Sequence, residues 1–462
     1  MRTNGAGGRA MDLKRDIYEK LVDWKKRDSG LVLELEGARQ VGKTYILNKF
    51  ASENYQNYFY MNMLQTSGQD FLRCLSKVRE WEPGQPRREH PLHDAFALYD
   101  SRFSDDKNTI VVIDEIQESA EVYSCIRQFA REFQCHFIVT GSYLGKTLER
   151  EYFLPAGDVE KLVLNSLSYE EFLYAAGKYE LYKEAELYGG SDHRIYDELK
   201  HWYEVYLRIG GYPAVVKKYL ETGDFAACEE TLMQVVDVFI DESSRYFNSV
   251  LDISLFEQVL PAVAQTMVRE KKGTSDLVTE LSKIIYKEES NRITKKSINY
   301  LLGWLYRSHI IGYCGKVNHG DRLDVTFNCR FYFRDIGVAQ IFLRMSGADA
   351  ATRAGILNEN FVYLYLLEDI AKLQIAGVTP NFGTYKEGEI DFFVISRIDD
   401  KAYGIEVKAG KSIGKTANLL LKDEKVDYVY LLKGDTYGGV LDQVKYTVPI
   451  YLTGKVTFDK GI

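Results

Sequence analysis

The sequence contains few prolines, no CxxC pair of cysteines and no HxxxH pair of histidines. Among its 462 residues there are only 8 Pro, 36 Gly, 6 Cys and 7 His. So little Pro and Gly excludes a collagen-like or Pro-rich chain. The absence of CxxC and HxxxH spacings argues against a zinc site or a redox dithiol, and six Cys are too few in so long a chain for a disulfide scaffold. We therefore expect reduced thiols.

Long apolar segments and a strong charge bias are also missing. No run of about 18 apolar residues occurs, as a membrane-spanning helix would need, and the N-terminal segment MRTNGAGGRAMDLKRD lacks the apolar stretch of a leader. We expect a cytoplasmic protein without membrane contact. With 59 Lys+Arg against 67 Asp+Glu, the formal charge of -8 excludes a protein that coats nucleic acid through its bulk charge, although a local basic face can still bind it.

The composition that remains is that of a globular protein, with 45% hydrophobic and 27% charged residues in a chain long enough for about three domains. Within residues 1–165, strand patterns alternate with helical patterns, which predicts a parallel α/β sheet. The predicted strands of this sheet are residues 31–36, 58–63, 109–114 and 136–140.

The rest of the chain divides into three further predicted domains. Residues 166–254 carry almost only helical patterns and are predicted to form a helical lid. In residues 255–335, two predicted helices (275–286 and 294–310) precede an alternating hairpin, an order typical of a winged-helix module. Residues 336–462 return to helix and strand patterns, which predicts a second α/β domain.

A phosphate-binding motif follows the first predicted strand. The segment GARQVGKT matches GxxxxGK[ST], in which a glycine-bounded loop turns backbone N–H groups toward phosphate oxygens and the next helix adds its N-terminal amides. Lys43 is expected to neutralise the terminal phosphates, and the Thr44 hydroxyl to ligate Mg²⁺. The predicted nucleotide-binding residues of this loop are Gly37, Ala38, Arg39, Gln40, Val41, Gly42, Lys43 and Thr44.

A second motif, TIVVIDE, is an apolar strand that ends in two carboxylates. Asp114 is expected to hold Mg²⁺, and Glu115 to orient and polarise the attacking water. The next strand ends in Thr140-Gly141-Ser142, and a hydroxyl of Thr140 or Ser142 there is expected to sense the γ-phosphate. The alternative is a simple cap between strand and loop.

Two arginines on the helix before that strand, Arg127 and Arg131, are candidates for a finger that acts on a neighbouring subunit's nucleotide. A solvated position on the helix surface is the alternative, and it is the simpler explanation for either arginine.

These motifs, in the forms GARQVGKT, VVIDEIQES and VTGSYLG, resemble a large family of predicted AAA+-type ATPases with a C-terminal domain of unknown function. The resemblance extends over nearly the whole chain, through RDIYEKLVDW, LSYEEFL, RIGGYPAVV and RFYFRDIGVAQIFL. It implies ATP and Mg²⁺ as cofactors. It also implies a nucleotide-contacting element at Gly211-Tyr212-Pro213, of which Pro213 would be the binding residue, although a plain helix-breaking turn fits as well. Many family members have an arginine where this chain has Asp158.

The last predicted domain carries a second candidate site. Asp391 lies in EIDFF, and Glu406 and Lys408 lie in EVK, where strand periodicity places the latter two on one face. This D…ExK order resembles restriction-endonuclease-like folds. The resemblance implies that Asp391, Glu406 and Glu359 bind Mg²⁺ and that Lys408 stabilises developing charge. A solvated strand face with a Glu–Lys pair is the alternative.

A locally basic segment suggests DNA as a partner. Residues 269–300 contain eight Lys and Arg against five acids, and a winged helix presents such a face to a DNA groove. Our leading hypothesis is a Mg²⁺-dependent ATPase whose nucleotide state repositions the last two domains on DNA. The alternatives are an ATP-gated, metal-dependent DNA nuclease, or a nucleotide-binding switch that recruits a protein partner and scarcely hydrolyses ATP. Beyond ATP and DNA, the partners considered are a second copy of the chain or another protein.

Overall fold

The computed structural model describes residues 12–80, 89–142, 157–247, 253–269, 281, 295–320, 322–323, 329–408 and 414–462. Contacts within the chain divide it into two compact units. One unit, here called the P-loop unit, consists of residues 15–165 and 307–309. The other, the C-terminal unit, consists of residues 1–14, 166–306 and 310–462, so that the three domains predicted after residue 165 lie together in it.

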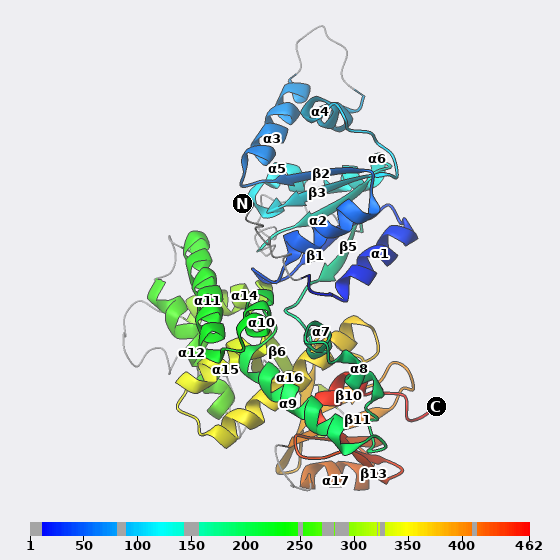
Figure 1. Cartoon of the computed structure of the whole chain (residues 1–462), viewed down its shortest axis with the longest axis vertical. Helices are drawn as coiled ribbons and strands as arrows, with labels where there is room; N and C mark the ends of the chain where they lie inside the picture. The colour runs from blue at the N-terminus through cyan, green and yellow to red at the C-terminus, as the bar shows by residue number, and fades with distance from the viewer. Residues whose placement is uncertain are drawn as a thin grey trace, which may run out of the picture. The chain divides into compact units, whose positions relative to one another are not determined.

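The P-loop unit is built on a sheet of five parallel strands in the order β2-β3-β4-β1-β5 (Figure 1). The parallel sheet confirms the predicted fold class, and β4 lies between the two strands that carry the motifs. The fifth strand, β5, was not predicted. The strands are β1 (Val32–Glu36), β2 (Asn57–Asn62), β3 (Thr109–Asp114), β4 (His136–Thr140) and β5 (Val159–Val163).

Helices enclose this sheet. The central strands β3 and β4 are buried at every position, as expected of parallel strands covered on both faces. On one face, Val111 and Phe137 pack in a core with Phe71, Phe96 and Phe129 from three of the helices. The helical elements of the unit are α1 (Ile17–Arg27), α2 (Lys43–Asn54), α3 (Thr66–Arg79), α4 (Pro91–Tyr99), η1 (Ile116–Glu118), α5 (Ala120–Tyr123) and α6 (Ile126–Glu132).

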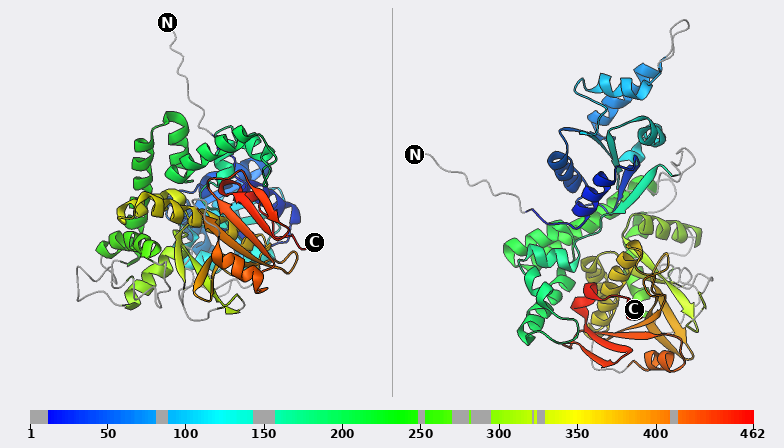
Figure 2. Two further views of the ribbon diagram at one scale, coloured as in Figure 1. Left: turned by 90° about the horizontal axis from the view of Figure 1, so that it is seen from below. Right: turned by 90° about the vertical axis from the view of Figure 1, so that its right-hand side faces the viewer.

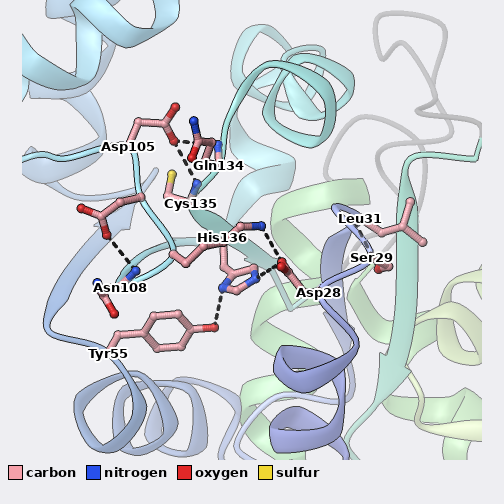
Figure 3. Close-up of polar contacts among 11 residues, drawn as sticks. Asp28, Ser29, Leu31, Tyr55, Asp105, Asn108, Gln134, Cys135 and His136 are labelled. Carbon is pink, nitrogen blue, oxygen red and sulfur yellow. Dashed lines mark hydrogen bonds and ion pairs between the residues drawn. The ribbon is translucent and has the colours of Figure 1, made fainter.

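The start of β4 is fastened to its surroundings by polar contacts (Figure 3). The ring of His136 lies between the hydroxyl of Tyr55, 2.9 Å from Nδ1, and the carboxylate of Asp28, 3.0 Å from Nε2. The carboxylate of Asp105 accepts hydrogen bonds from the backbone amides of Gln134 and Cys135. Burial lowers the pKa of His136, although Asp28 partly offsets this effect. His136 therefore has a structural role in the neutral form.

Helices fill the first part of the C-terminal unit, in the region where strand patterns are missing from the sequence. Ser168 begins the first of them with a capping box, in which its hydroxyl accepts the amide of Glu171 and the carboxylate of Glu171 accepts the amide of Ser168. The helices are α7 (Tyr169–Ala175), α8 (Tyr179–Glu184), α9 (His193–Ile209), α10 (Pro213–Thr222), α11 (Phe225–Phe247) and α12 (Ile253–Arg269).

The Gly-Gly-Tyr-Pro turn between α9 and α10 is a tightly packed joint. Gly210 has a φ of 74°, and the amide of Gly211 donates to the buried carboxylate of Asp335 at 2.9 Å. A Cβ on Gly211 would lie 2.2 Å from the carbonyl oxygen of Leu167, so only glycine fits there. Pro213 is the first residue of α10, a position that Pro favours. These contacts account for the motif, and the nucleotide contact of Pro213 stays a prediction.

The C-terminal unit also contains a nine-stranded mixed sheet. The central strands of this sheet pack against two helices, α16 (Ala350–Ala371) and α17 (Lys415–Lys422) (Figures 1 and 2). The other helical elements that the structure describes in this unit are α14 (Lys295–Arg307), α15 (Ile336–Met345) and η3 (Ile450–Lys455). The strands are β6 (Ile311–Asn318), β7 (Arg322–Leu323), β8 (Arg330–Phe333), β9 (Asn381–Tyr385), β10 (Gly388–Ile395), β11 (Ala402–Lys408), β12 (Tyr428–Lys433), β13 (Gly439–Asp442) and β14 (Lys445–Pro449).

The predicted hairpin is part of this sheet. Strand β6 pairs antiparallel with β8, as predicted, but it also pairs in parallel with β9. The boundary predicted between residues 335 and 336 therefore does not separate two sheets, because β6 belongs to both pairings. The predicted helix at 294–310 corresponds to α14, whereas the one at 275–286 lies outside the described residues apart from Leu281.

Candidate functional site

The phosphate loop connects the end of β1 to the start of α2, as the motif predicts. Positive φ angles at Gly37 (147°), Gln40 (61°) and Gly42 (99°) turn the backbone into a compact loop. A Cβ on Gly37 would lie 2.2 Å from the carbonyl oxygen of Leu164, so the loop packs directly on the residue that follows β5. The glycines at both ends of the motif thus meet conformational demands that other residues rarely meet.

The two motifs meet at Thr44 and Asp114. The hydroxyl of Thr44 donates to Oδ2 of Asp114 at 2.8 Å, which places the end of β3 beside the first turn of α2. The ammonium of Lys43 donates to the carbonyl oxygens of Gly37 (2.7 Å) and Ala38 (2.9 Å). The Lys43 ammonium, the Thr44 hydroxyl and the Asp114 carboxylate therefore lie together at the loop. These are the groups that a phosphate chain with bound Mg²⁺ would need.

Sequence analysis missed Tyr60 of β2 as a member of this site. Its hydroxyl donates to the same Oδ2 of Asp114 at 2.7 Å, while Oδ1 accepts the amide of Glu115 at 2.8 Å. Burial, followed by the charge of Asp114, raises the pKa of Tyr60 to about 12. The tyrosine therefore remains a donor at neutral pH and fixes the orientation of the carboxylate.

Glu115 is held by two polar side chains. It has a φ of 50°, and its Oε2 accepts hydrogen bonds from Nε2 of Gln117 (2.5 Å) and from the hydroxyl of Ser142 (3.0 Å). The other hydroxyl at the end of β4, that of Thr140, is buried and donates to the carbonyl oxygen of Leu35 at 2.7 Å. Of the two predicted phosphate sensors, Ser142 is thus the one beside the acidic pair, and Thr140 links β4 to β1.

Arg127 and Arg131, the candidate fingers, share a partner within the same unit. Nε of Arg131 lies 2.8 Å from Oδ1 of Asp158, and Nε of Arg127 lies 4.0 Å from Oδ2. Asp158 therefore joins α6 to the start of β5. Both arginine side chains remain about half exposed, at 52% and 53%, so a role toward another subunit stays a prediction.

The second predicted site brings its residues together in the C-terminal unit. Glu359 from α16, Asp391 from β10 and Lys408 from β11 line one cavity of about 260 Å³. The ammonium of Lys408 lies 2.7 Å from the carboxylate of Glu406 and 3.8 Å from that of Asp391. The amide of Val407 also donates to Asp391 at 2.6 Å.

Two further charged residues, which sequence analysis missed, line the same cavity. Arg330 of β8 forms an ion pair with Glu389, and its guanidinium stacks 4.0 Å from the ring centre of Phe382. Arg330 lies on the strand that the sequence assigned to a different domain, so no local pattern connects it with the D…ExK residues.

Among the described residues, no group of three or more His, Cys, Asp and Glu side chains stands close enough to hold a metal ion. The metal-binding role of Glu359, Asp391 and Glu406 therefore stays a prediction. The Lys408 ammonium pairs with the carboxylates of Glu406 and Asp391. Burial, followed by the charge of Asp391, raises the pKa of Glu359 to about 8 and that of Glu406 to about 7. The nucleotide site is different, because Mg²⁺ needs only one or two protein ligands beside phosphate and water.

Comparison with known families agrees with the geometry of the P-loop unit. Residues 29–173 match the family model described as an AAA domain. The chain contains an AAA-type P-loop domain. A second model, described as a domain of unknown function (DUF8612), matches residues 200–349. This second match ends before α16 and includes none of the D…ExK residues. No curated protein matches the chain.

Several solved structures are distantly similar. The Walker-type ATPase PABY2304 of Pyrococcus abyssi is 13% identical, over 72% of this chain and 96% of that chain, with a TM-score of 0.41. The Aeropyrum pernix ORC2 protein is 10% identical, over 76% and 96%, with a TM-score of 0.35. The Thermotoga maritima RuvB Holliday junction branch migration motor is 14% identical, over 65% and 89%, with a TM-score of 0.29. TM-scores this low identify neither a substrate nor a partner.

Among the described residues, no helix has the length and apolar character needed to cross a membrane.

Proposed function

We propose that the AAA-type domain binds ATP with Mg²⁺ and hydrolyses it. The observation that carries this proposal is the hydrogen bond of 2.8 Å between the Thr44 hydroxyl and the Asp114 carboxylate, with Glu115 next in the chain. Two side chains 70 residues apart are held where P-loop enzymes hold the metal that accompanies the nucleotide.

The residues of the site then divide the chemistry among them. The amides of residues 37–44 and the Lys43 ammonium bind the phosphates. Mg²⁺, when bound, would supply positive charge that offsets the negative charge of the phosphate oxygens. Glu115 orients the attacking water, while its Oε2 accepts hydrogen bonds from Gln117 and Ser142. Thr44 and Asp114 orient the cation.

Two substitutions test the proposal. Glu115→Gln keeps the loop and the Thr44–Asp114 pair, so we expect nucleotide affinity to be retained while hydrolysis falls by at least about 100-fold, the usual loss for a positioned base. Lys43→Ala should weaken binding itself. Measured turnover that survives in Glu115→Gln would reject the assigned role, and wild-type protein that binds no ATP would reject the function.

We further propose that the nucleotide state acts on the C-terminal unit in contact with DNA. The face of α14 opposite its buried stripe supports this idea, since Lys296 and Asn299 are exposed while Ile298 and Leu301 are buried. ATP turnover measured with and without single- and double-stranded DNA is the test. Stimulation that weakens with added salt indicates phosphate contacts, and turnover independent of DNA argues against them.

The contacts of Glu115 favour one alternative, a nucleotide-binding switch with little hydrolysis. Gln117 and Ser142 both donate to Oε2 of Glu115, and hydrogen bonds to a carboxylate make it a weaker base. Under this alternative the protein binds ATP tightly, turns over slowly under all conditions, and recruits a protein partner in one nucleotide state. Ser142→Ala should then raise the basal rate.

The charged cavity of the C-terminal unit favours another alternative, an ATP-gated nuclease. It gathers Glu359, Asp391 and Lys408 as the D…ExK pattern predicts, but a metal ion requires that Lys408 release its carboxylate partners. Cleavage of single- or double-stranded DNA in Mg²⁺ or Mn²⁺, abolished by Asp391→Ala, would support this alternative. Protein inert on both DNA forms with ATP present would exclude it.

A further inference from the structure

The phosphate loop is held by an arginine outside the two nucleotide-binding motifs, the first residue of the segment RDIYEKLVDW. Arg15 is the first residue of the P-loop unit, and it is almost fully buried, with 7% of its surface exposed. One guanidinium nitrogen, Nη1, donates to the carbonyl oxygen of Val41 at 2.9 Å. The other, Nη2, donates to the carbonyl oxygen of Asn165 at 2.6 Å. A buried cation thus bridges two backbone segments that are far apart in the sequence.

The contact with Val41 has a direct consequence for the phosphate-binding amides. In a trans peptide, the carbonyl of one residue and the N–H of the next point in opposite directions. Arg15 fixes the direction of the Val41 carbonyl, and this fixes the N–H of Gly42, which points away from the arginine. Gly42 is the N-cap of α2, so its amide is one of the donors that a phosphate meets.

The contact with Asn165 ties the same guanidinium to the boundary of the unit. The chain enters the P-loop unit at Arg15 and leaves it after Asn165. Next to Asn165, the amide of Leu164 donates to the carbonyl of Glu36 at 2.8 Å, and Glu36 is the residue before the phosphate loop. Both ends of the loop are therefore linked to residues 164–165.

We infer that Arg15 is a positioning residue for nucleotide binding, and that it couples occupancy of the phosphate loop to the connector at residues 164–167. The inference rests on the proposed ATP binding and adds a route by which the nucleotide state reaches the boundary of the unit. Because such coupling is reciprocal, an event that displaces Asn165 also changes the orientation of the Gly42 amide.

Equilibrium binding of a fluorescent ATP analogue to the full chain with Mg²⁺ tests the first part. Hydrogen bonds from a charged donor are strong enough that Arg15→Ala should weaken binding about 10- to 100-fold. Arg15→Lys keeps the charge but cannot bridge both carbonyls, so an intermediate affinity is expected. Arg27→Ala is the matched control, because Arg27 lies on the neighbouring α1 and is exposed; it should bind like the wild type.

Hydrogen exchange tests the coupling to residues 164–167. If Arg15 were only structural, its substitution would leave the effect of nucleotide on amide exchange at 164–167 unchanged. At saturating nucleotide, the wild type should show slower exchange of the amides at 164–167 than without nucleotide. In Arg15→Lys this response should be lost although the site is filled, and circular dichroism verifies that the variants are folded. If Arg15→Ala does not fold, Arg15→Lys decides the question.

The outcomes separate this inference from the proposed function. Wild-type protein that does not bind the analogue shows that the proposed ATP site is wrong. Wild-type binding together with unchanged affinity in both Arg15 variants, or a nucleotide response at 164–167 that persists in Arg15→Lys, overturns the role of Arg15 alone.

Discussion

The most direct test of the metal-binding arrangement is the removal of one oxygen atom from Tyr60. The Tyr60 hydroxyl and the Thr44 hydroxyl both donate to Oδ2 of Asp114, at 2.7 and 2.8 Å. Tyr60→Phe deletes one of these hydrogen bonds and leaves the ring packing in place. Because Asp114 then loses a restraint on its orientation, we expect weaker binding of Mg²⁺ in the nucleotide complex.

The size of this effect follows from the kind of hydrogen bond. A bond to a charged acceptor contributes about 1.5–3 kcal/mol when buried. Tyr60 is only half-buried, so a value just below this range, about 1–1.5 kcal/mol, is appropriate, and it corresponds to about a 5- to 13-fold change. The apparent dissociation constant of Mg²⁺, measured through ATP hydrolysis, should rise by that factor. Nucleotide binding without Mg²⁺ should not change.

The assay is a titration of ATPase rate with Mg²⁺ at fixed nucleotide concentration. Tyr58→Phe is the matched control, since Tyr58 lies on the same strand and donates to Asn48 rather than to Asp114. The pKa of Tyr60, raised to about 12 by burial and then by Asp114, means that the difference from the wild type should not vary between about pH 6 and 9. An equal shift in both variants, or tighter Mg²⁺ binding in Tyr60→Phe, would refute the reasoning.

Three further predictions concern stability and cation binding. Gly211→Ala places a Cβ 2.2 Å from a carbonyl oxygen and should destabilise the protein by about 1–3 kcal/mol, whereas Gly355→Ala on open helix surface should stabilise it by up to about 1 kcal/mol in thermal unfolding. The buried His136 has a lowered pKa, so as the pH falls below about 6.5 the unfolded chain binds a proton before the folded protein does. The free energy of unfolding should therefore decrease below that pH. His136→Gln should remove this pH dependence of the unfolding free energy. The raised pKa values of Glu359 (about 8) and Glu406 (about 7) mean that protons compete with cations, so Mn²⁺ affinity measured by calorimetry should increase at least about tenfold from pH 6 to 9.

The sequence was sufficient for the nucleotide site wherever its chemistry is local. The phosphate loop is eight consecutive residues, and its strand and helix are set by the pattern on either side. The acidic pair follows an apolar strand that is buried at every position, so Asp114 and Glu115 could be placed at the edge of the sheet. Even the position of β4 between β1 and β3 could be predicted, because the order of strands in doubly wound sheets is restricted.

The residues that were missed act over long range. Nothing near Tyr60 or Arg15 in the sequence indicates that their side chains meet Asp114 and Val41. Strand β5 has the sequence VEKLV, with two adjacent charged residues and no buried position, so this short edge strand has little apolar pattern. The pairing of β6 with β9 likewise depends on a strand more than 60 residues away, which a hairpin pattern does not include.

The phosphate loop of this protein is restrained from two directions, and the two restraints have different consequences. On one side, the hydrogen bond from Thr44 to Asp114 joins the loop to the acidic pair, which would carry out hydrolysis. On the other, Arg15 and Leu164 join it to the residues at which the chain leaves the unit. Under the proposed function, binding of a phosphate chain should act on both sides, whereas loss of the γ-phosphate should act at Glu115, the residue assigned to the attacking water. A variant that affects only Asp114 should change turnover and leave the connector's response to bound nucleotide intact, whereas a variant of Arg15 should weaken nucleotide binding and abolish that response.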